Sequence, residues 1–133
     1  MEIKRFGVSL EKDVLDILDN YVKDKKFPNR SQAIRHLIRK INVEKNWEDN
    51  NEVAGAIVLV YDHHKRELQK QSTTIQHNFH ELILAVQHVH LDHDSCLETI
   101  SVRGKAKDLT DLANQLIAIK GIKHGKLVMS TIK

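Results

Sequence analysis

Residues 87–98, with the sequence QHVHLDHDSCLE, constrain the fold of this chain most strongly, because they combine two alternating histidines with its only cysteine. On a β-strand the side chains of His88 and His90 point to the same face, roughly 6.6 Å apart along the strand. If the strand doubles back after His90, Cys96 lies opposite His90 and Glu98 opposite His88. This stretch therefore predicts a β-hairpin that gathers two imidazoles and a thiol on one face.

The same register places apolar residues together at the far end of the hairpin, where Val86 pairs with Ile100 and Leu84 with Val102. Two imidazoles and a thiolate are suitable ligands for Ni, Cu, Zn or Co, whereas Mg and Ca prefer oxygen. The alternative is a surface hairpin with incidental histidines and a free buried cysteine. In the metal-binding interpretation, a fourth ligand has to come from another part of the chain.

The pattern around the hairpin predicts an α+β domain. A β-branched run at residues 53–61 precedes a helix at 64–79; strands at 82–91 and 96–103 are followed by a helix at 107–120, which Gly121 stops, and a strand at 122–132. This β-α-β-β-α-β order is typical of a ferredoxin-like fold. The first of these helices has few apolar positions and carries His77 and His80, with His63 and His64 near its start, so it is the candidate source of the missing ligand.

The N-terminal third predicts a separate small module. Residues 3–10 alternate as in a β-strand and residues 11–26 have the apolar spacing of a helix. A second helix is expected from Asn29 as N-cap, with Gln32 three residues later. Because the strand has no partner nearby in the sequence, pairing with the same strand of a second chain is the simplest way to satisfy its backbone.

The expected domain organisation is an N-terminal domain at residues 1–46, a polar linker at 47–52 and the ferredoxin-like domain at 53–133. Residues 1–45 hold 11 Lys and Arg against seven Asp and Glu, a small basic surplus that a dimer would double. The longest apolar runs are far shorter than the roughly 20 residues needed to span a bilayer. With no apolar signal segment near the start, the chain is expected to be cytoplasmic and to have no membrane partner.

Strand, helix and helix in about 45 residues resemble a ribbon-helix-helix DNA-binding module. In that family, two strands pair into an antiparallel ribbon that enters the major groove, and the second helix anchors the DNA backbone. The resemblance implies double-stranded DNA as a partner. The corresponding positions are Arg5, Gly7 and Ser9 facing the bases, and Asn29, Arg30 and Ser31 at the phosphates.

The combination of this module with the histidine-cysteine hairpin resembles the nickel-responsive transcriptional regulator family, NikR. The similarity includes NRSQAIR at residues 29–35, YDHHKREL at 61–68, the pair Gln76–His77, the hairpin itself and GIKHGKL at 121–127. It implies an ACT-type ferredoxin-like domain and a homotetramer with one Ni(II) per subunit. It also implies a square-planar site made by His88, His90 and Cys96 of one chain and His77 of another.

The function implied by the resemblance is that of a nickel-responsive regulator, mainly a repressor, which binds a pseudo-palindromic promoter operator and is not an enzyme. The alternative is a cytoplasmic nickel storage or delivery protein that does not regulate genes. Five further residues are expected to steady the ligands or to bind metal weakly: His63, His64, His80, His93 and Glu98.

Overall fold

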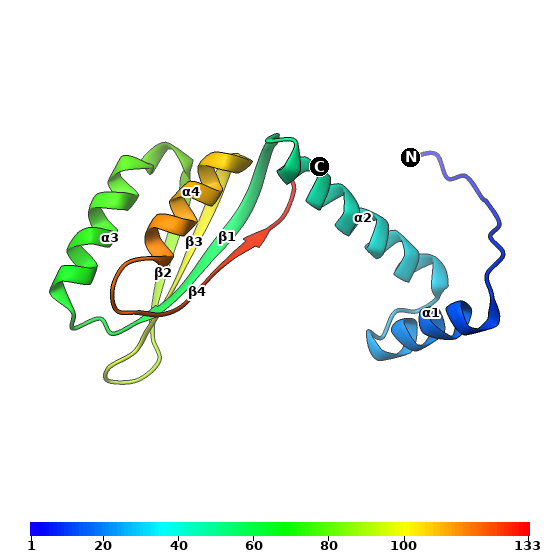
Figure 1. The fold of residues 1–133 in the computed structure, drawn as a ribbon, viewed down its shortest axis with the longest axis horizontal. Coiled ribbons are helices and arrows are strands. Elements are labelled where there is room, and N and C mark those ends of the chain that lie inside the picture. Colours follow the sequence, from blue (N-terminus) through cyan, green and yellow to red (C-terminus); the bar gives the residue numbers. More distant parts are fainter. The chain divides into compact units, whose positions relative to one another are not determined.

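The computed structural model describes residues 1–133 and divides the chain into two compact units, Met1–Ile41 and Asn42–Lys133. Figure 1 traces the chain through both. None of its helices combines the length and the apolar character that crossing a membrane requires.

The N-terminal unit contains α1 (Lys12–Asp24) and the first turns of α2 (Arg30–Glu48). The backbone N–H of Gln32 donates a hydrogen bond of 2.9 Å to Oδ1 of Asn29, which confirms the predicted N-cap. The predicted strand at 3–10 is not formed in the single chain, where residues 1–11 have no regular secondary structure. The physical reason is that a lone strand has no neighbour with which to form ladder hydrogen bonds.

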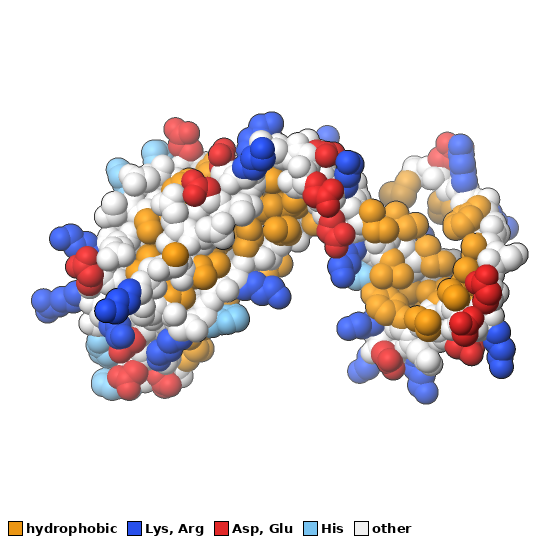
Figure 2. Space-filling view, in the orientation of Figure 1, with side chains coloured by type: hydrophobic (Ala, Val, Ile, Leu, Met, Phe, Trp, Pro, Cys, Tyr) orange, Lys and Arg blue, Asp and Glu red, His pale blue; other side chains and the backbone are white.

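Apolar side chains of the N-terminal unit are largely exposed. Ala33 is its only buried hydrophobic residue, whereas Ile3 is 80% exposed, Phe6 76% and Ile17 69%. Figure 2 shows hydrophobic side chains gathered on the part of the surface formed by this unit. A unit of this size with so little buried apolar area does not have a core of its own, so its stability depends on burying this surface elsewhere.

The C-terminal unit has the predicted β-α-β-β-α-β order. Its elements are β1 (Glu52–Tyr61), α3 (Arg66–Asn78), a short 3-10 turn η1 (His80–Leu82), β2 (Ile83–His90), β3 (Cys96–Lys105), α4 (Ala106–Ile117) and β4 (Ile122–Met129). The four strands form one antiparallel sheet in the order β2-β3-β1-β4. Both helices lie on the same side of this sheet (Figure 1).

The core lies between α4 and the two central strands. Ile57 of β1 and Ile100 of β3 are fully buried, as are Leu109, Leu112 and Leu116 of α4. By contrast, α3 buries only Leu68 and Ser72, as its sparse apolar pattern predicts. Thus α4 is a firmly packed helix, and α3 is attached to the same core by a much smaller apolar contact.

The prediction of a linker at residues 47–52 is wrong in detail. These residues form the end of α2, a turn and the start of β1. Trp47 is only 8% exposed and packs in the core, and its indole Nε1 donates a hydrogen bond of 2.8 Å to the carbonyl oxygen of Ser130. The polar residues on either side of Trp47 conceal this anchor in the sequence. The last turns of α2 therefore belong to the C-terminal unit, which begins at Asn42.

The hairpin register is confirmed near the turn. His90 lies opposite Cys96, His88 opposite Glu98, and Val86 opposite Ile100. The predicted pairing of Leu84 with Val102 is wrong, because a bulge between Ile83 and Ala85 brings Ile83 opposite Val102 instead. A bulge adds one residue to one strand and so shifts the pairing only on its far side.

Replacing Trp47 with alanine tests its role as an anchor. The Trp47→Ala substitution leaves a cavity in the core and removes the hydrogen bond to Ser130, so we expect it to lower the free energy of unfolding by about 3–5 kcal/mol. Urea unfolding followed by circular dichroism measures the change. Glu44→Ala, an exposed substitution on the same helix, is the control and should have little effect. Equal stability of the two variants would contradict the anchoring role.

Candidate metal centre

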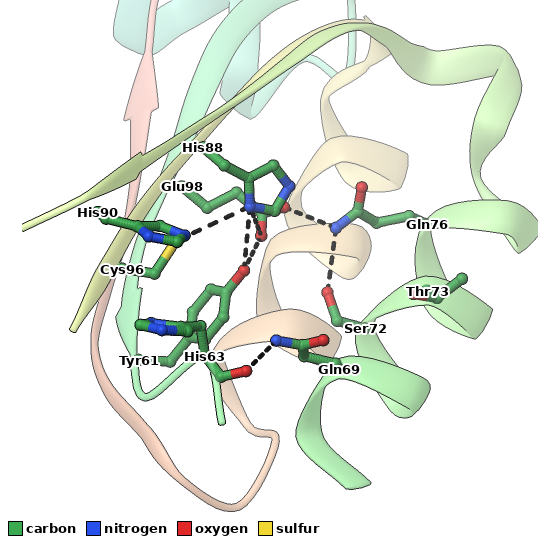
Figure 3. Close-up of a pocket in the computed structure, with 10 residues that line it drawn as sticks. All are labelled: Tyr61, His63, Gln69, Ser72, Thr73, Gln76, His88, His90, Cys96 and Glu98. Atoms are coloured by element: carbon green, nitrogen blue, oxygen red, sulfur yellow. Dashed lines mark hydrogen bonds and ion pairs between the residues drawn. The ribbon is translucent and has the colours of Figure 1, made fainter. Parts of the chain in front are cut away.

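The predicted ligands of the hairpin lie at a hollow of about 390 Å³ between the β2–β3 hairpin, the end of β1 and α3. Figure 3 shows the side chains around it. They come from β1, α3, β2 and β3 and from the loop after β1. The lining residues are Tyr61, His63, Gln69, Ser72, Thr73, Gln76, His88, His90, Cys96 and Glu98.

Cys96 and the two hairpin histidines are close together in one chain. The Cys96 Sγ atom lies 3.8 Å from Nδ1 of His88, and Cys96 is directly opposite His90 across the hairpin. The thiol is 1% exposed, whereas the side chain of His88 is 54% exposed. The sulfur therefore forms the floor of the hollow and the imidazoles lie at its rim.

A buried carboxylate supports this arrangement from below. Glu98 is 1% exposed and accepts hydrogen bonds from the hydroxyl of Tyr61 and from Nε2 of Gln76, the second at 2.8 Å. Its Oε1 also lies 3.6 Å from Nδ1 of His88. Gln76 in turn donates to Oγ of Ser72. Because a buried carboxylate is costly without partners, this network holds α3 and β1 in place around the hairpin (Figure 3).

The same burial affects Tyr61. Desolvation raises the pKa of Tyr61 well above its ordinary value, and the hydrogen bond and negative charge of Glu98 raise it further. The phenol therefore stays protonated and remains a hydrogen-bond donor. Its oxygen also lies 3.4 Å from Nδ1 of His88, so Tyr61 contacts both Glu98 and one of the predicted metal ligands.

His63 joins the hollow from the loop after β1. Its ring stacks on that of His90, with centroids 4.4 Å apart and planes 10° apart. Burial lowers the pKa of His63, and the neighbouring rings of His64 and His90 lower it further. Its Nδ1 atom is buried and has no hydrogen-bond partner. A neutral imidazole with an unused nitrogen at this position is chemically able to act as a ligand.

His77, the fourth predicted ligand, is not part of this hollow. It is exposed near the end of α3, and its ring stacks with that of His80 at a centroid distance of 5.9 Å. Nδ1 of His80 contacts the backbone oxygen of His77 at 3.0 Å. The single chain therefore brings together three of the four predicted ligands, and the fourth is directed elsewhere.

Two further predicted metal-site residues are His64, in the loop after β1, and His93, in the hairpin loop, and their ring centroids lie 5.3 Å apart. Neither residue forms a hydrogen bond with Cys96 or His88. Glu98 alone among the five expected supporting residues contacts a hairpin ligand through its polar atoms, whereas His63 does so by ring stacking.

The predicted DNA-facing residues are exposed in the single chain. Arg5, Gly7 and Ser9 lie in the irregular segment before α1. Arg30 forms two hydrogen bonds to Asp19, of 2.8 and 3.0 Å, and this contact lowers the pKa of Asp19. Asn29 caps α2. Thus two of the three predicted phosphate contacts already have partners within the chain.

The sequence did not predict that Tyr61, Ser72 and Gln76 line the hollow. A signal for Tyr61 was present, because the β-branched run ends at this residue and the YDHHKREL motif begins with it. Its pairing with Cys96 across β1 and β3 is seen only in the structure. Gln76 directly precedes His77 in the motif. Ser72 had no distinguishing signal, because a serine on a helix is most often a solvent-facing residue.

The donor set fits a borderline or soft divalent metal. A buried thiol next to imidazole nitrogens is typical of sites for nickel, copper, zinc or cobalt and is unsuitable for Mg or Ca. The Tyr61 hydroxyl and Oε1 of Glu98 lie 3.4 and 3.6 Å from Nδ1 of His88, on the side of the ring from which an outer partner orients an imidazole. The fold and the hollow together define a ferredoxin-like metal-binding domain.

The comparisons with known proteins agree with this class. An ACT domain from a GTP pyrophosphokinase of Chlorobium tepidum has a similar fold, with a TM-score of 0.50 at 16% identity over 59% of this chain and all of that domain. An uncharacterized protein from Thermotoga maritima has a TM-score of 0.54 at 18% identity, over 59% of this chain and 98% of that one. These similarities establish an ACT-like fold for the C-terminal unit.

The family is shown by closer relatives. The family model described as NikR C terminal nickel binding domain matches residues 54–130. Curated relatives classed as nickel-responsive regulators, from Syntrophus aciditrophicus and Desulfotalea psychrophila, are each 48% identical to this chain. The alignments cover 98% and 97% of this chain and 96% and 95% of those proteins. The chain belongs to the NikR family of nickel-responsive regulators, a family of transcription regulators and not of enzymes, and nickel is its metal.

Removing the Tyr61 hydroxyl tests the support below the hairpin. Tyr61→Phe leaves the buried Glu98 carboxylate without one of its donors, so we expect the metal-free protein to lose about 1–3 kcal/mol of unfolding free energy. Denaturant unfolding measures this loss. Tyr21→Phe is the matched control, because Tyr21 stacks on Phe27 and makes no side-chain hydrogen bond. A Tyr61→Phe protein as stable as the control would contradict the network.

Proposed function

We propose that this chain is a nickel-dependent DNA-binding repressor. In this proposal, each nickel ion is held by His88, His90 and Cys96 of one chain and by His77 of a second chain, with one ion per subunit. The main supporting observation is the hairpin register, which brings a buried thiol within 3.8 Å of an imidazole at the rim of a hollow. Because the site opens to solvent at the rim, it can exchange metal with solution. Its occupancy then follows the nickel concentration.

A ligand from a second chain is supported by the position of His77. It is exposed, it lies on the less firmly packed helix, and it is absent from the residues lining the hollow of its own chain. A site shared between chains makes nickel a link between subunits. We therefore propose a homotetramer, a dimer of dimers, in which nickel bridges the C-terminal domains and orders α3 at the same time.

Dimerisation of the N-terminal unit follows from its exposed apolar residues. A hollow in this unit is lined by Ile3, Phe6, Ile34 and Ile38, with Ser31 and four basic residues around it: Lys4, Arg5, Arg35 and Arg39. We propose that residues 3–10 of two chains pair as an antiparallel ribbon over this apolar surface. Pairing would satisfy the backbone of the segment and turn Phe6, Val8 and Leu10 inward.

The ribbon formed in this way would present Arg5, Gly7 and Ser9 to the major groove. Gly7 has no side chain with which to read a base, so sequence reading rests on Arg5 and Ser9. The space around Gly7 is open, with no atom within 4 Å of the position of a Cβ. At the DNA backbone, we propose that Ser31 and the N–H groups at the start of α2 contact a phosphate. Arg30 is held nearby by Asp19, and Asn29 fixes the helix start.

Regulation in this proposal is a coupling between two binding sites. Nickel stabilises a tetramer arrangement in which both ribbons engage one pseudo-palindromic operator in promoter DNA. Such coupling is reciprocal, so DNA should tighten nickel binding by the same factor by which nickel tightens DNA binding. The alternative, a nickel storage or delivery protein, has no such coupling.

DNA affinity tests the regulatory proposal. DNA fragments that bind the protein are first selected from genomic DNA in the presence of nickel. We expect nickel to lower the Kd for these fragments at least about fivefold at fixed salt. The Kd should also rise steeply with salt concentration. Tight nickel binding with unchanged DNA affinity would contradict the regulator and leave the storage protein.

A substitution in the proposed ribbon tests how the DNA is read. Arg5→Ala should weaken binding to the selected operator by about 1–3 kcal/mol and reduce the preference for it over random DNA. Lys107→Ala removes the same charge from an exposed position on α4 and is the control. Equal losses in the two variants would indicate that Arg5 contributes charge only and would contradict its base-reading role.

A further inference from the structure

Arg30 of the N-terminal unit is paired with a carboxylate of its own chain. Its Nε and Nη2 atoms donate hydrogen bonds to Oδ1 and Oδ2 of Asp19, at 2.8 and 3.0 Å. Two parallel hydrogen bonds between a guanidinium and a carboxylate fix the direction of both groups. No other basic side chain of the unit Met1–Ile41 forms an ion pair. This contact therefore distinguishes Arg30 from every other basic residue near the proposed DNA surface.

The Asp19–Arg30 pair joins the two helices of the unit. Asp19 lies in the second half of α1, and Arg30 is the first residue of α2. The helices also meet through aromatic rings, because Phe27 stacks on Tyr21 and lies 5.3 Å from the ring of His36. The arrangement of α1 and α2 thus has a second support. We expect loss of the Asp19 carboxylate to change the state of Arg30 more than it changes the fold.

The guanidinium of Arg30 keeps donors for a further partner. A guanidinium side chain has five N–H groups, and Asp19 accepts from one on Nε and one on Nη2. The remaining N–H groups, two on Nη1 and one on Nη2, make no hydrogen bond within the chain. The Arg30 side chain is 56% exposed, so solvent or a ligand can reach them. Asp19 therefore orients the guanidinium and leaves it able to donate to a phosphate.

The same contact changes how Arg30 acts on a distant anion. The hydrogen bonds of the pair raise the pKa of Arg30 and lower that of Asp19, so both groups stay charged. Opposite charges in contact act as a dipole, and a phosphate about 10 Å away is also screened by salt. Such a phosphate is attracted far less by the pair than by a free arginine. The basic residues around the apolar hollow have no carboxylate partner: Lys4, Arg5, Arg35 and Arg39.

We propose that Asp19 is a specificity-determining residue for DNA binding, which makes Arg30 effective only where the protein is seated on its operator. At a distance, Asp19 cancels the charge of Arg30, so Arg30 adds little to loose association with random DNA. At contact, the oriented N–H groups of Arg30 donate to a phosphate while Asp19 stays bound behind them. Asp19 acts through Arg30 and is a positioning residue. This inference rests on the proposed DNA-binding function and deepens it.

Distance decides which effect of Asp19 is larger. A charge-assisted hydrogen bond from the guanidinium to a phosphate oxygen is about 2.8 Å long. The carboxylate of Asp19 lies behind the guanidinium, at roughly twice that distance or more from the same phosphate. Attraction therefore exceeds repulsion in the seated complex. In loose complexes, where water separates Arg30 from the DNA, the two nearly cancel. Asp19 thus weakens binding to random DNA more than binding to the operator.

The affinities for operator fragments and for random DNA test the role of Asp19. In the full-length protein, Asp19→Asn frees the charge of Arg30. The dependence of log Kd on log salt for random DNA should then steepen by about 0.9, the contribution of one additional phosphate contact. The operator affinity should not gain to the same extent, because Arg30 has lost its orientation. The ratio of operator to random-DNA affinity should fall at least about threefold at about 50 mM salt.

Two further variants separate the pair from charge alone. Asp16→Asn removes the same charge from an exposed residue one turn earlier on α1 that forms no ion pair. It should change both affinities by the same factor and leave their ratio as in the wild type. Asp19→Glu retains a carboxylate and should retain the salt dependence of the wild type. An equal ratio in Asp19→Asn and Asp16→Asn, or an Asp19→Glu protein as salt-dependent as Asp19→Asn, would overturn the role of Asp19.

Nuclear magnetic resonance tests the pair in the absence of DNA. Exchange of the Arg30 Nε–H with water should be slow in the wild-type protein and at least about tenfold faster in Asp19→Asn, since that hydrogen bond is lost. Circular dichroism should show the same helix content in both proteins, as the aromatic contacts between α1 and α2 remain. Equal exchange rates in the two proteins would overturn the pair as the device that orients Arg30.

These outcomes are separate from the outcome for the proposed function. Every comparison of Asp19 variants is made at one fixed nickel concentration, so it does not depend on whether nickel changes the affinity. A wild-type protein whose DNA affinity ignores nickel would contradict the nickel-dependent repressor and leave the affinity ratio to decide the role of Asp19. An unchanged ratio in Asp19→Asn would contradict the role of Asp19 and leave nickel-dependent repression intact.

Discussion

The structure around the candidate metal centre depends on one buried polar group, the carboxyl group of Glu98. It lies opposite His88 in the hairpin and holds Tyr61 of β1 and Gln76 of α3 by hydrogen bonds. A carboxylate that is 1% exposed is stable only if such partners are present. The positions of the hairpin, the end of β1 and α3 therefore depend on one another through Glu98. The same contacts position the thiol and the imidazoles.

The two units of the chain are stabilised in different ways. The C-terminal unit has a closed core between α4 and the central strands and is anchored to α2 by Trp47. The N-terminal unit has one buried hydrophobic residue and leaves most of its apolar side chains exposed. A unit without a core of its own depends on association with another chain for its stability. Association of chains would complete both the N-terminal unit and, through His77, the proposed nickel site.

Much of this fold was accessible from the sequence, because its patterns are local. The hairpin register near the turn follows from the two-residue periodicity of strands, and the α3 and α4 helices differ in packing as their apolar spacing predicts. The bulge near Ile83 and the anchoring of Trp47 were not predicted, because both depend on contacts between distant segments. The network of Ser72, Gln76 and Tyr61 was missed for the same reason. The strand at residues 3–10 remains a prediction that a single chain cannot satisfy.

The central claim is that nickel is held between two chains. Mixing subunits of two variants tests it directly, because His77→Ala and Cys96→Ser each remove one part of the shared site. Each variant alone should lack the thiolate-to-nickel band of a complete site. Unfolding them together and refolding the mixture should restore about a quarter of the wild-type band per chain, if subunits combine at random. A full band in His77→Ala alone, or no band in the mixture, would contradict a site shared between chains.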